Sequence, residues 1–231
     1  MKKERLLLFL TILTVGMTGC LREGMDTIAL PFGKIPSGVI PQEIREQFEE
    51  HIPIYEGVTP PDITGQYLNR PDLLVFTSDG QFSPGDEFAP QYISFQNQTP
   101  SGMAIYSEKQ ANTVSEASEV YVVGSGRNFS AYFISNVTRY DDYGNVTSTA
   151  KMSTVISGTV TVDGIENYRM AFVMLEKNDP HQELMDVNEY RVFQDGDGLA
   201  IRYNWTKSSV DEENHLPMCT DAGNNKNLKI K

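Results

Sequence analysis

Histidine and cysteine, the residues that most often bind metals or act as nucleophiles with a base, are scarce in this chain. The 231 residues include three histidines, His51, His181 and His215, and two cysteines. No histidine has a nearby His or Cys partner at metal-ligand spacing, and the chain lacks a Gly-x-Ser-x-Gly nucleophile motif. We therefore predict no metal, no cofactor and no catalytic residue. A pair of carboxylates that folding brings together, as in glycosidases, stays open as an alternative.

The chain also lacks an apolar run long enough to cross a bilayer as a helix, which takes about 20 residues. Its longest run, Leu6–Val15, spans ten residues and follows a basic start at Lys2, Lys3 and Arg5. A short apolar run after a basic start, followed by small residues, is typical of a secretory signal peptide.

The end of this signal, Met17-Thr-Gly-Cys20, resembles the lipobox of bacterial lipoproteins. The resemblance implies that residues 1–19 are removed and that Cys20 is acylated, which would anchor the protein to a membrane. Leu21 resembles residues that permit sorting to the outer membrane, so a bacterial envelope location is expected. An ordinary secretory signal is the alternative. With Cys20 acylated, Cys219 has no partner, so a hydrophobic core has to stabilise the fold.

The chain has fewer basic than acidic residues. The chain has 19 Lys and Arg against 31 Asp and Glu, a net charge of −12. Phosphate backbones repel so acidic a surface, and we therefore expect no nucleic-acid partner.

One amphipathic helix is predicted near the start of the mature chain. Residues 20–39 contain repeated Gly and Pro and are interpreted as a tether. Ile40, Ile44, Phe48 and Ile52 then recur every four residues, and Pro41 suits a first helical turn. The helix should pack its single apolar stripe on the domain that follows.

The rest of the chain favours β-structure. Asp163-Gly164 is the clearest hairpin signal, and Asp195-Gly-Asp-Gly198 is interpreted as a second hairpin turn. About nine or ten strands are expected: 63–67, 73–77, 91–96, 102–107, 120–123, 129–140, 146–162, 168–175, 187–194 and 199–206.

Apolar and polar residues alternate with a period of two, and this alternation indicates the fold class. Met152 and Ile156 share one face of their strand, and Leu199, Ile201, Tyr203 and Trp205 share one face of theirs. This pattern predicts an antiparallel sheet with one face in a core and the other in water. We predict an all-β domain over residues 40–206, an up-and-down barrel or alternatively a β-sandwich, and a polar tail over 207–231.

A resemblance favours the barrel. Gly65-Gln66-Tyr67, placed after the helix and before the meander, resembles the Gly-x-Trp or Gly-x-Tyr that opens the first strand of lipocalin-like (calycin) barrels. The stretch Ile52–Tyr67 also resembles small lipoproteins of Bacteroidetes-type bacteria. Together these resemblances imply a lipocalin-like barrel.

Two functions follow from this fold, and neither is enzymatic. In the first, the barrel binds a small apolar or amphipathic ligand, because about eight strands can enclose one. In the second, the interior is filled and the protein binds a protein partner in an envelope assembly. No charged anchor is expected on the inner face. The residues expected to line a pocket are Met152, Ile156, Tyr168, Met170, Phe172, Met174, Tyr203 and Trp205.

Overall fold

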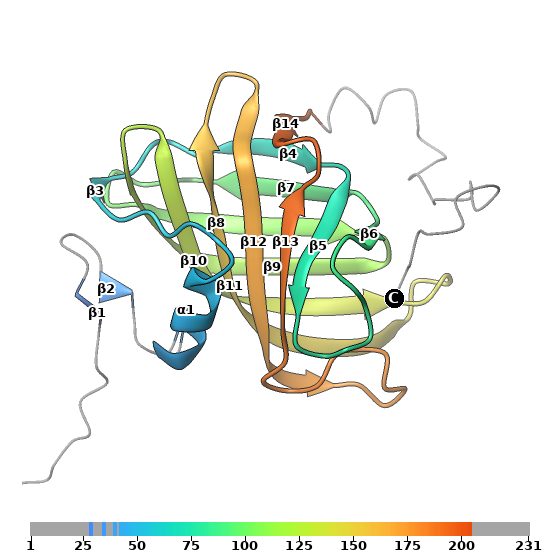
Figure 1. Ribbon diagram of the computed structural model, residues 1–231. Coiled ribbons are helices and arrows are strands. Elements are labelled where there is room, and N and C mark those ends of the chain that lie inside the picture. The colour runs from blue at the N-terminus through green and yellow to red at the C-terminus, as the bar shows by residue number, and fades with distance from the viewer. Residues whose placement is uncertain (1–27, 30–33, 36–38, 41, 205–231) are drawn as a thin grey trace, which may run out of the picture.

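The computed structural model describes residues 28–29, 34–35, 39–40 and 42–204, which form one short helix and fourteen strands (Figure 1). The predicted signal peptide, Cys20, Trp205 and the polar tail lie outside the described residues. The elements are β1 (Ile28–Ala29), β2 (Lys34–Ile35), α1 (Gln42–Glu49), β3 (Val58–Thr59), β4 (Gly65–Asn69), β5 (Asp72–Thr77), β6 (Glu87–Phe88), β7 (Gln91–Gln96), β8 (Met103–Gln110), β9 (Thr113–Ser125), β10 (Asn128–Tyr140), β11 (Val146–Val160), β12 (Gly164–Asn178), β13 (Tyr190–Asp195) and β14 (Leu199–Arg202).

Twelve strands form one sheet that closes on itself. Its order is β11-β10-β9-β8-β7-β4-β14-β12-β13-β5-β6, and β11 also pairs with β12, which closes the first eight of these strands into a ring. All pairings in the ring are antiparallel, and β3 adds a short parallel pairing to β9. The remaining two-stranded sheet, β1–β2, is separate. The predicted all-β, up-and-down barrel is confirmed, because the β11–β12 pairing joins what a sandwich would leave as separate sheets.

Three strands of the barrel are each interrupted once. β4 and β5 pair in the same register with β7 and β6 respectively, so that Asn69 lies opposite Gln91 and Asp72 opposite Phe88. In the same way, β13 and β14 both pair with β12 on one side; on the other side β13 pairs with β5 and β14 with β4. The three interrupted strands are therefore β4 with β5, β6 with β7, and β13 with β14. Counted as continuous strands, the circuit has eight, and its two layers cross one another in Figure 1.

These pairings correct one sequence prediction. β13 and β14 do not pair with each other, so Asp195-Gly-Asp-Gly198 is a bend between two segments that share the partner β12 and not a hairpin turn. The Asp195 carboxylate accepts hydrogen bonds from the backbone N–H groups of Asp197 and Leu199 and so stabilises the bend. By contrast, Asp163-Gly164 does connect the paired strands β11 and β12, as predicted.

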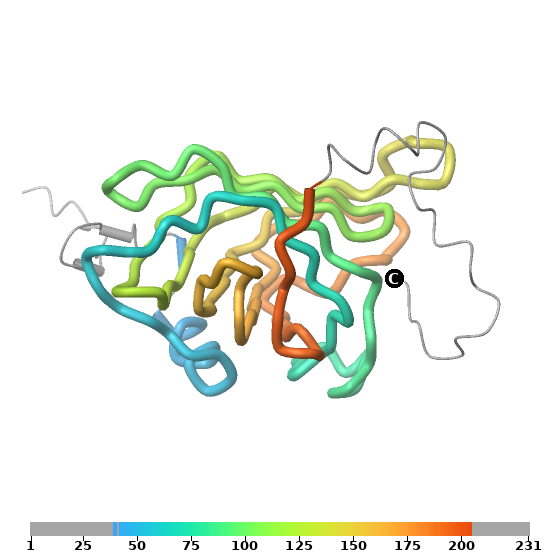
Figure 2. The backbone as a smooth tube through the Cα atoms, turned by 90° about the horizontal axis from the view of Figure 1, so that it is seen from above, coloured from blue at the N-terminus to red at the C-terminus, as the bar shows by residue number. Residues whose placement is uncertain are grey.

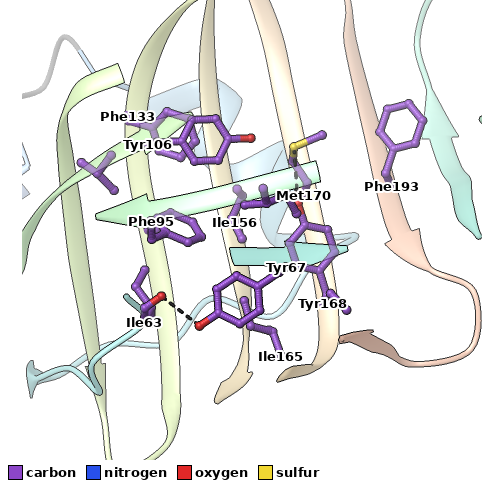
Figure 3. Close-up of a cluster of buried hydrophobic side chains, with 14 of the residues drawn as sticks. Ile63, Tyr67, Phe95, Tyr106, Phe133, Ile156, Ile165, Tyr168, Met170 and Phe193 are labelled. Atoms are coloured by element: carbon purple, nitrogen blue, oxygen red, sulfur yellow. Dashed lines mark hydrogen bonds between the residues drawn. The ribbon is translucent and has the colours of Figure 1, made fainter. Parts of the chain in front are cut away.

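The barrel interior is packed mainly with aromatic and branched side chains (Figure 3). The rings of Tyr106 and Phe133 lie 4.4 Å apart between centroids, and those of Phe95 and Tyr106 lie 5.4 Å apart. Tyr67, from the Gly65-Gln66-Tyr67 motif, has no exposed surface and donates a hydrogen bond from its hydroxyl to the carbonyl of Ile63 at 2.9 Å.

The helix covers the outside of the barrel. Phe48 of α1 is buried against outward-facing residues of β11, β12 and β13, among them Val155 and Val173. Ile40 and Ile52, which flank the helix, are buried in the same cluster. Figure 2 shows α1 beside this layer and outside the barrel.

The predicted helix is confirmed, but it is shorter than its predicted apolar stripe: Ile44 and Phe48 lie on it, whereas Ile40 and Ile52 flank it. The expectation of one sheet face in water is wrong for β11, because α1 and the chain around it bury its outer face. Burial of both faces of β12 agrees with its sequence, which is apolar on both sides over 168–175.

Among the described residues, no helix has the length and apolar character needed to cross a membrane.

Candidate functional site

Most of the residues expected to line a pocket do face the barrel interior. Ile156, Tyr168, Met170 and Met174 are at most 4 % exposed, and they belong to the core clusters inside the barrel. A side chain with essentially no accessible surface lines no space that admits even a water molecule. These four residues are therefore packed core residues in this structure.

Met152 and Phe172 differ, because both face inward and yet are half-buried. They pack with the half-buried Leu184, from the loop between β12 and β13, and with the buried Met174 and Met185. We call Met152, Phe172 and Leu184 the apolar end of the barrel. It is the place where predicted pocket residues keep accessible surface.

Tyr203 lies outside the barrel, which corrects its predicted inward orientation. On β14 the inward residue is Ala200, which has no exposed surface, whereas Ile201 is 44 % exposed. Tyr203 packs its ring on Tyr92, 5.5 Å away, and Tyr92 lies on the outer face of β7. The alternation of Leu199, Ile201 and Tyr203 was read correctly, but this side of the strand faces outward. Trp205, the last residue of that pattern, is outside the described residues.

A polar cluster inside the barrel was not predicted from the sequence. It consists of side chains from β4, β5, β7, β8 and β12 that point to the same side as the apolar core. Asn69, Gln91 and Gln110 lie opposite one another in one row across β4, β7 and β8. The full cluster is Asn69, Asp72, Gln91, Tyr106, Glu108, Gln110 and Tyr168.

Gln91 is the centre of this polar cluster. Its Nε2 donates to Glu108 Oε1 at 2.9 Å and to Met170 Sδ at 3.3 Å. Its Oε1 accepts from Asn69 Nδ2 at 3.2 Å and from the Tyr168 hydroxyl at 2.9 Å. Gln91 has no exposed surface, so these bonds replace the water that its amide loses on folding.

The two carboxyl groups of the cluster are held by amide and hydroxyl donors. Asp72 accepts from Asn69 Nδ2 at 2.9 Å and from Gln110 Nε2 at 2.8 Å. Glu108 accepts from the Tyr106 hydroxyl at 2.5 Å in addition to its bond from Gln91. Within the part of the chain that the structure describes, no Lys, Arg or His forms an ion pair with either carboxyl group.

Burial without a cation makes these carboxyl groups weak acids. Burial raises the pKa of Asp72 to about 7, and the nearby Glu108 and Asp195 carboxyl groups add to this increase. Burial also raises the pKa of Glu108, although the bonds from Tyr106 and Gln91 oppose the shift. The pKa of Asp195, at the neighbouring bend, is raised to about 6, again chiefly by burial. At neutral pH the cluster can therefore hold or release a proton.

The carboxyl groups of this cluster act as hydrogen-bond acceptors, and its tyrosine hydroxyls act as donors. The pKa values of Tyr106 and Tyr168 are raised well above the ordinary tyrosine value by burial, so both hydroxyls stay protonated. Among the described residues, no group of three or more His, Cys, Asp or Glu is placed to hold a metal ion. Of the histidines, His51 stacks on Phe76 at 4.3 Å on the outside of the barrel, and His215 lies outside the described residues.

The polar cluster is connected to the apolar end. Glu108 lies opposite Ser115 on β9, and Ser115 lies opposite Val137 on β10. Val137 packs with Met174, Met185 and the apolar end. Glu108 and Gln110 are themselves half-buried, whereas Asn69, Asp72 and Gln91 are at most 1 % exposed.

One sequence signal could have indicated this cluster. On β8, Ala104, Tyr106, Glu108 and Gln110 share one face, and the first two are apolar enough to mark it as the core face. The sequence predicts a strand over 102–107, and the same alternation continues to its polar end at Glu108 and Gln110. The row Asn69–Gln91–Gln110 depends on pairing between strands, which has no local signature.

We compared the chain with protein-family models, with curated proteins and with solved structures, and found no match in any of the three.

Proposed function

We propose that this protein is a lipid-anchored protein of the bacterial envelope whose barrel binds a small amphipathic ligand at the apolar end. The observation that carries the proposal is the half-buried state of Met152, Phe172 and Leu184, which lie together at one end of the barrel, whereas most other inward-facing apolar residues, Val160 excepted, are almost fully buried. Methionine side chains adapt to irregular partners, which suits a binding surface.

The anchor in this proposal is Cys20, and it rests on the lipobox resemblance alone. Acylation at this position would place the barrel at the end of the tether, at the membrane surface. The outer membrane is the proposed location, because of Leu21.

Titration of the full-length chain with 1-octanol, with the heat of binding measured by calorimetry, tests the ligand proposal. Burial of an alkyl chain contributes about 0.8 kcal/mol per CH₂, so an octyl chain should bind with a Kd of about 10–100 μM.

A blocking variant locates the binding site. Leu184 lies in a loop whose backbone is held by Asp179, which accepts from the Leu184 N–H at 2.8 Å, so a larger side chain here should not disturb the strands. Leu184→Trp should fill the apolar end and weaken octanol binding at least about tenfold. Val162→Trp, at a position that is 85 % exposed, is the matched control and should bind octanol as the parent does. Equal binding by both variants would place the ligand elsewhere.

A second function has its own support. Much of the interior has no accessible surface, as expected of a barrel that serves as a rigid module for binding a protein partner in an envelope assembly. Absence of octanol binding in the parent chain would favour this function.

A further inference from the structure

We propose that the polar cluster selects a ligand with a cationic, hydrogen-bond-donating head group, such as a primary ammonium, and that the alkyl part of the ligand lies at the apolar end. This inference rests on the proposed ligand-binding function and specifies its ligand class. Its basis is a count of hydrogen-bond donors and acceptors inside the barrel.

The donors of the cluster are all in use. Both hydrogens on Nδ2 of Asn69 are donated, to Asp72 and Gln91, and both on Nε2 of Gln91 are donated, to Glu108 and Met170. Both on Nε2 of Gln110 are donated, to Asp72 and to the carbonyl of Ala89. The Tyr106 and Tyr168 hydroxyls donate to Glu108 and Gln91. No amide or hydroxyl hydrogen of the cluster remains for a ligand.

Acceptor capacity, in contrast, is left over. Each carboxylate oxygen can accept two hydrogen bonds, yet each oxygen of Asp72 and Glu108 receives one from the cluster. Asn69 adds an independent observation: its Oδ1 is fully buried and has no hydrogen-bond partner. Because Nδ2 of the same amide is held by Asp72 and Gln91, the position of Oδ1 within the cluster is fixed.

A buried carbonyl oxygen that lacks a hydrogen bond lowers the stability of the fold, and so does a buried carboxylate that lacks a cation. A group that brings several donors and a positive charge to Glu108, the half-buried carboxyl group, would use its spare acceptor capacity and offset the negative charge of the nearby Asp72. An anion or a pure acceptor would be repelled. An ammonium group has three donors and no acceptor. A metal ion is a poorer fit, because no group of three ligating residues is present among the described residues.

Access to the cluster is from the side of Glu108 and Gln110, the two half-buried members. Two contacts lead from there toward the apolar end. Ser115 and Val137 connect Glu108 to Met152 and Phe172, and the Gln91–Met170 contact reaches β12, where Phe172 follows on the same face. An amphipathic amine can therefore place its head at Glu108 and its chain against Phe172.

The test compares octylammonium with 1-octanol, by calorimetry on the full-length chain at pH 8. The two probes share the alkyl chain and differ in the charged head. Octylammonium should bind at least about tenfold more tightly than octanol. In Glu108→Gln, a change that keeps the side-chain shape, the two affinities should become equal within about threefold.

Asp72→Asn serves as a second variant if Glu108→Gln does not fold, and the same loss of preference for the ammonium is expected. Asp163→Asn, at an exposed position in the β11–β12 turn, is the matched control and should keep the preference. The preference should also decrease from pH 8 to pH 5.5, because the cluster then carries protons while octylammonium stays charged.

The outcomes separate the two proposals. If octanol and octylammonium bind the parent chain equally, the cationic selectivity is wrong and the ligand-binding function remains. If the preference persists in both Glu108→Gln and Asp72→Asn, the polar cluster is not its source. If neither probe binds, both proposals fail.

Discussion

Asp72 shows how strongly a single buried side chain can connect folding to pH. Its carboxyl group is 1 % exposed and has amide donors as its hydrogen-bond partners. With a pKa of about 7 it ionises in the folded protein near neutral pH, far above its ordinary value of 3.8. The folded state therefore binds a proton that the unfolded state has already released at pH 5 or 6.

The free energy of unfolding should consequently fall as the pH rises from about 4 to about 7. A carboxyl group whose folded-state pKa is raised stabilises the fold fully below its unfolded pKa, and this stabilisation is lost as the pH passes the folded value. One pKa unit corresponds to about 1.4 kcal/mol, so the total fall is on the order of a few kcal/mol. Carboxyl groups whose pKa is lowered in the folded state, such as Asp79 and Asp179, make stability depend on pH below this pH range.

Urea unfolding of the parent and of Asp72→Asn across pH 4–8 measures this effect. The variant should show a clearly flatter pH profile, while Asp163→Asn should retain the slope of the parent. A parent profile that rises over this range would show that Asp72 is ionised in the folded state.

At the same scale, the sequence indicates apolar core residues better than polar ones. Ile156, Met170 and Phe172 were predicted to face inward, Ile156 from alternation along its strand, and all three do. Gln91 and Glu108 were missed because a polar residue at a core-facing position is stable only where partners from other strands satisfy it. Those partners, Asn69 and Tyr168 among them, come from β4 and β12, which no local pattern connects.

At the scale of the elements, α1 is an example of a short helix stabilised by tertiary packing. Eight residues are too few for an isolated helix in water. Phe48 has no exposed surface and packs its ring 5.9 Å from that of Tyr190 on β13. The helix therefore exists because the outer face of the barrel gives its apolar stripe a partner.

Phe48→Ala should lower the free energy of unfolding by about 3–5 kcal/mol, as expected for a large side chain removed from a core. The neighbouring Gln47 is exposed, and Gln47→Ala should change stability by no more than about 0.5 kcal/mol. Urea midpoints of the two variants, compared at equal slope, provide the measurement. A loss below about 1 kcal/mol for Phe48→Ala would mean that α1 contributes little to the fold.

Strand prediction succeeded where strands are long and failed at interruptions. β11 follows from sustained alternation, β12 from a run that is apolar on both faces, and the Asp163-Gly164 turn from its hairpin composition. The four residues of β14 are too few to identify the inward side, and the small Ala200 faces the core where larger neighbours crowd it. Asp195-Gly-Asp-Gly198 has the composition of a hairpin turn, but a shared partner strand made it a bend.

At the scale of the whole molecule, the domain and its proposed anchor are separate parts of one chain. The barrel is formed by residues within 42–204, and Cys20 lies outside the described residues. Cys20→Ala should therefore release the protein from membranes and leave the barrel folded. Membrane fractionation with a carbonate wash measures release, and circular dichroism of the soluble variant checks the fold. A variant that still sediments with membranes would contradict the lipobox interpretation.

The pairing of β14 with β4 bears on how the chain reaches its fold. Among the described strands, these two are the last and the first of the ring. Ile201 lies opposite Leu68, although most of the sequence of the domain separates them. As a chain emerges from its N-terminus, each hairpin of the meander can form when its second strand appears, because its partner is close in sequence. The edge of β4 has to wait for β14. Until then β13 can already pair with β5, but the edge of β4 stays unpaired. An unpaired edge is the form most prone to pair with another chain. Folding to completion is therefore decided by the last strand to be made.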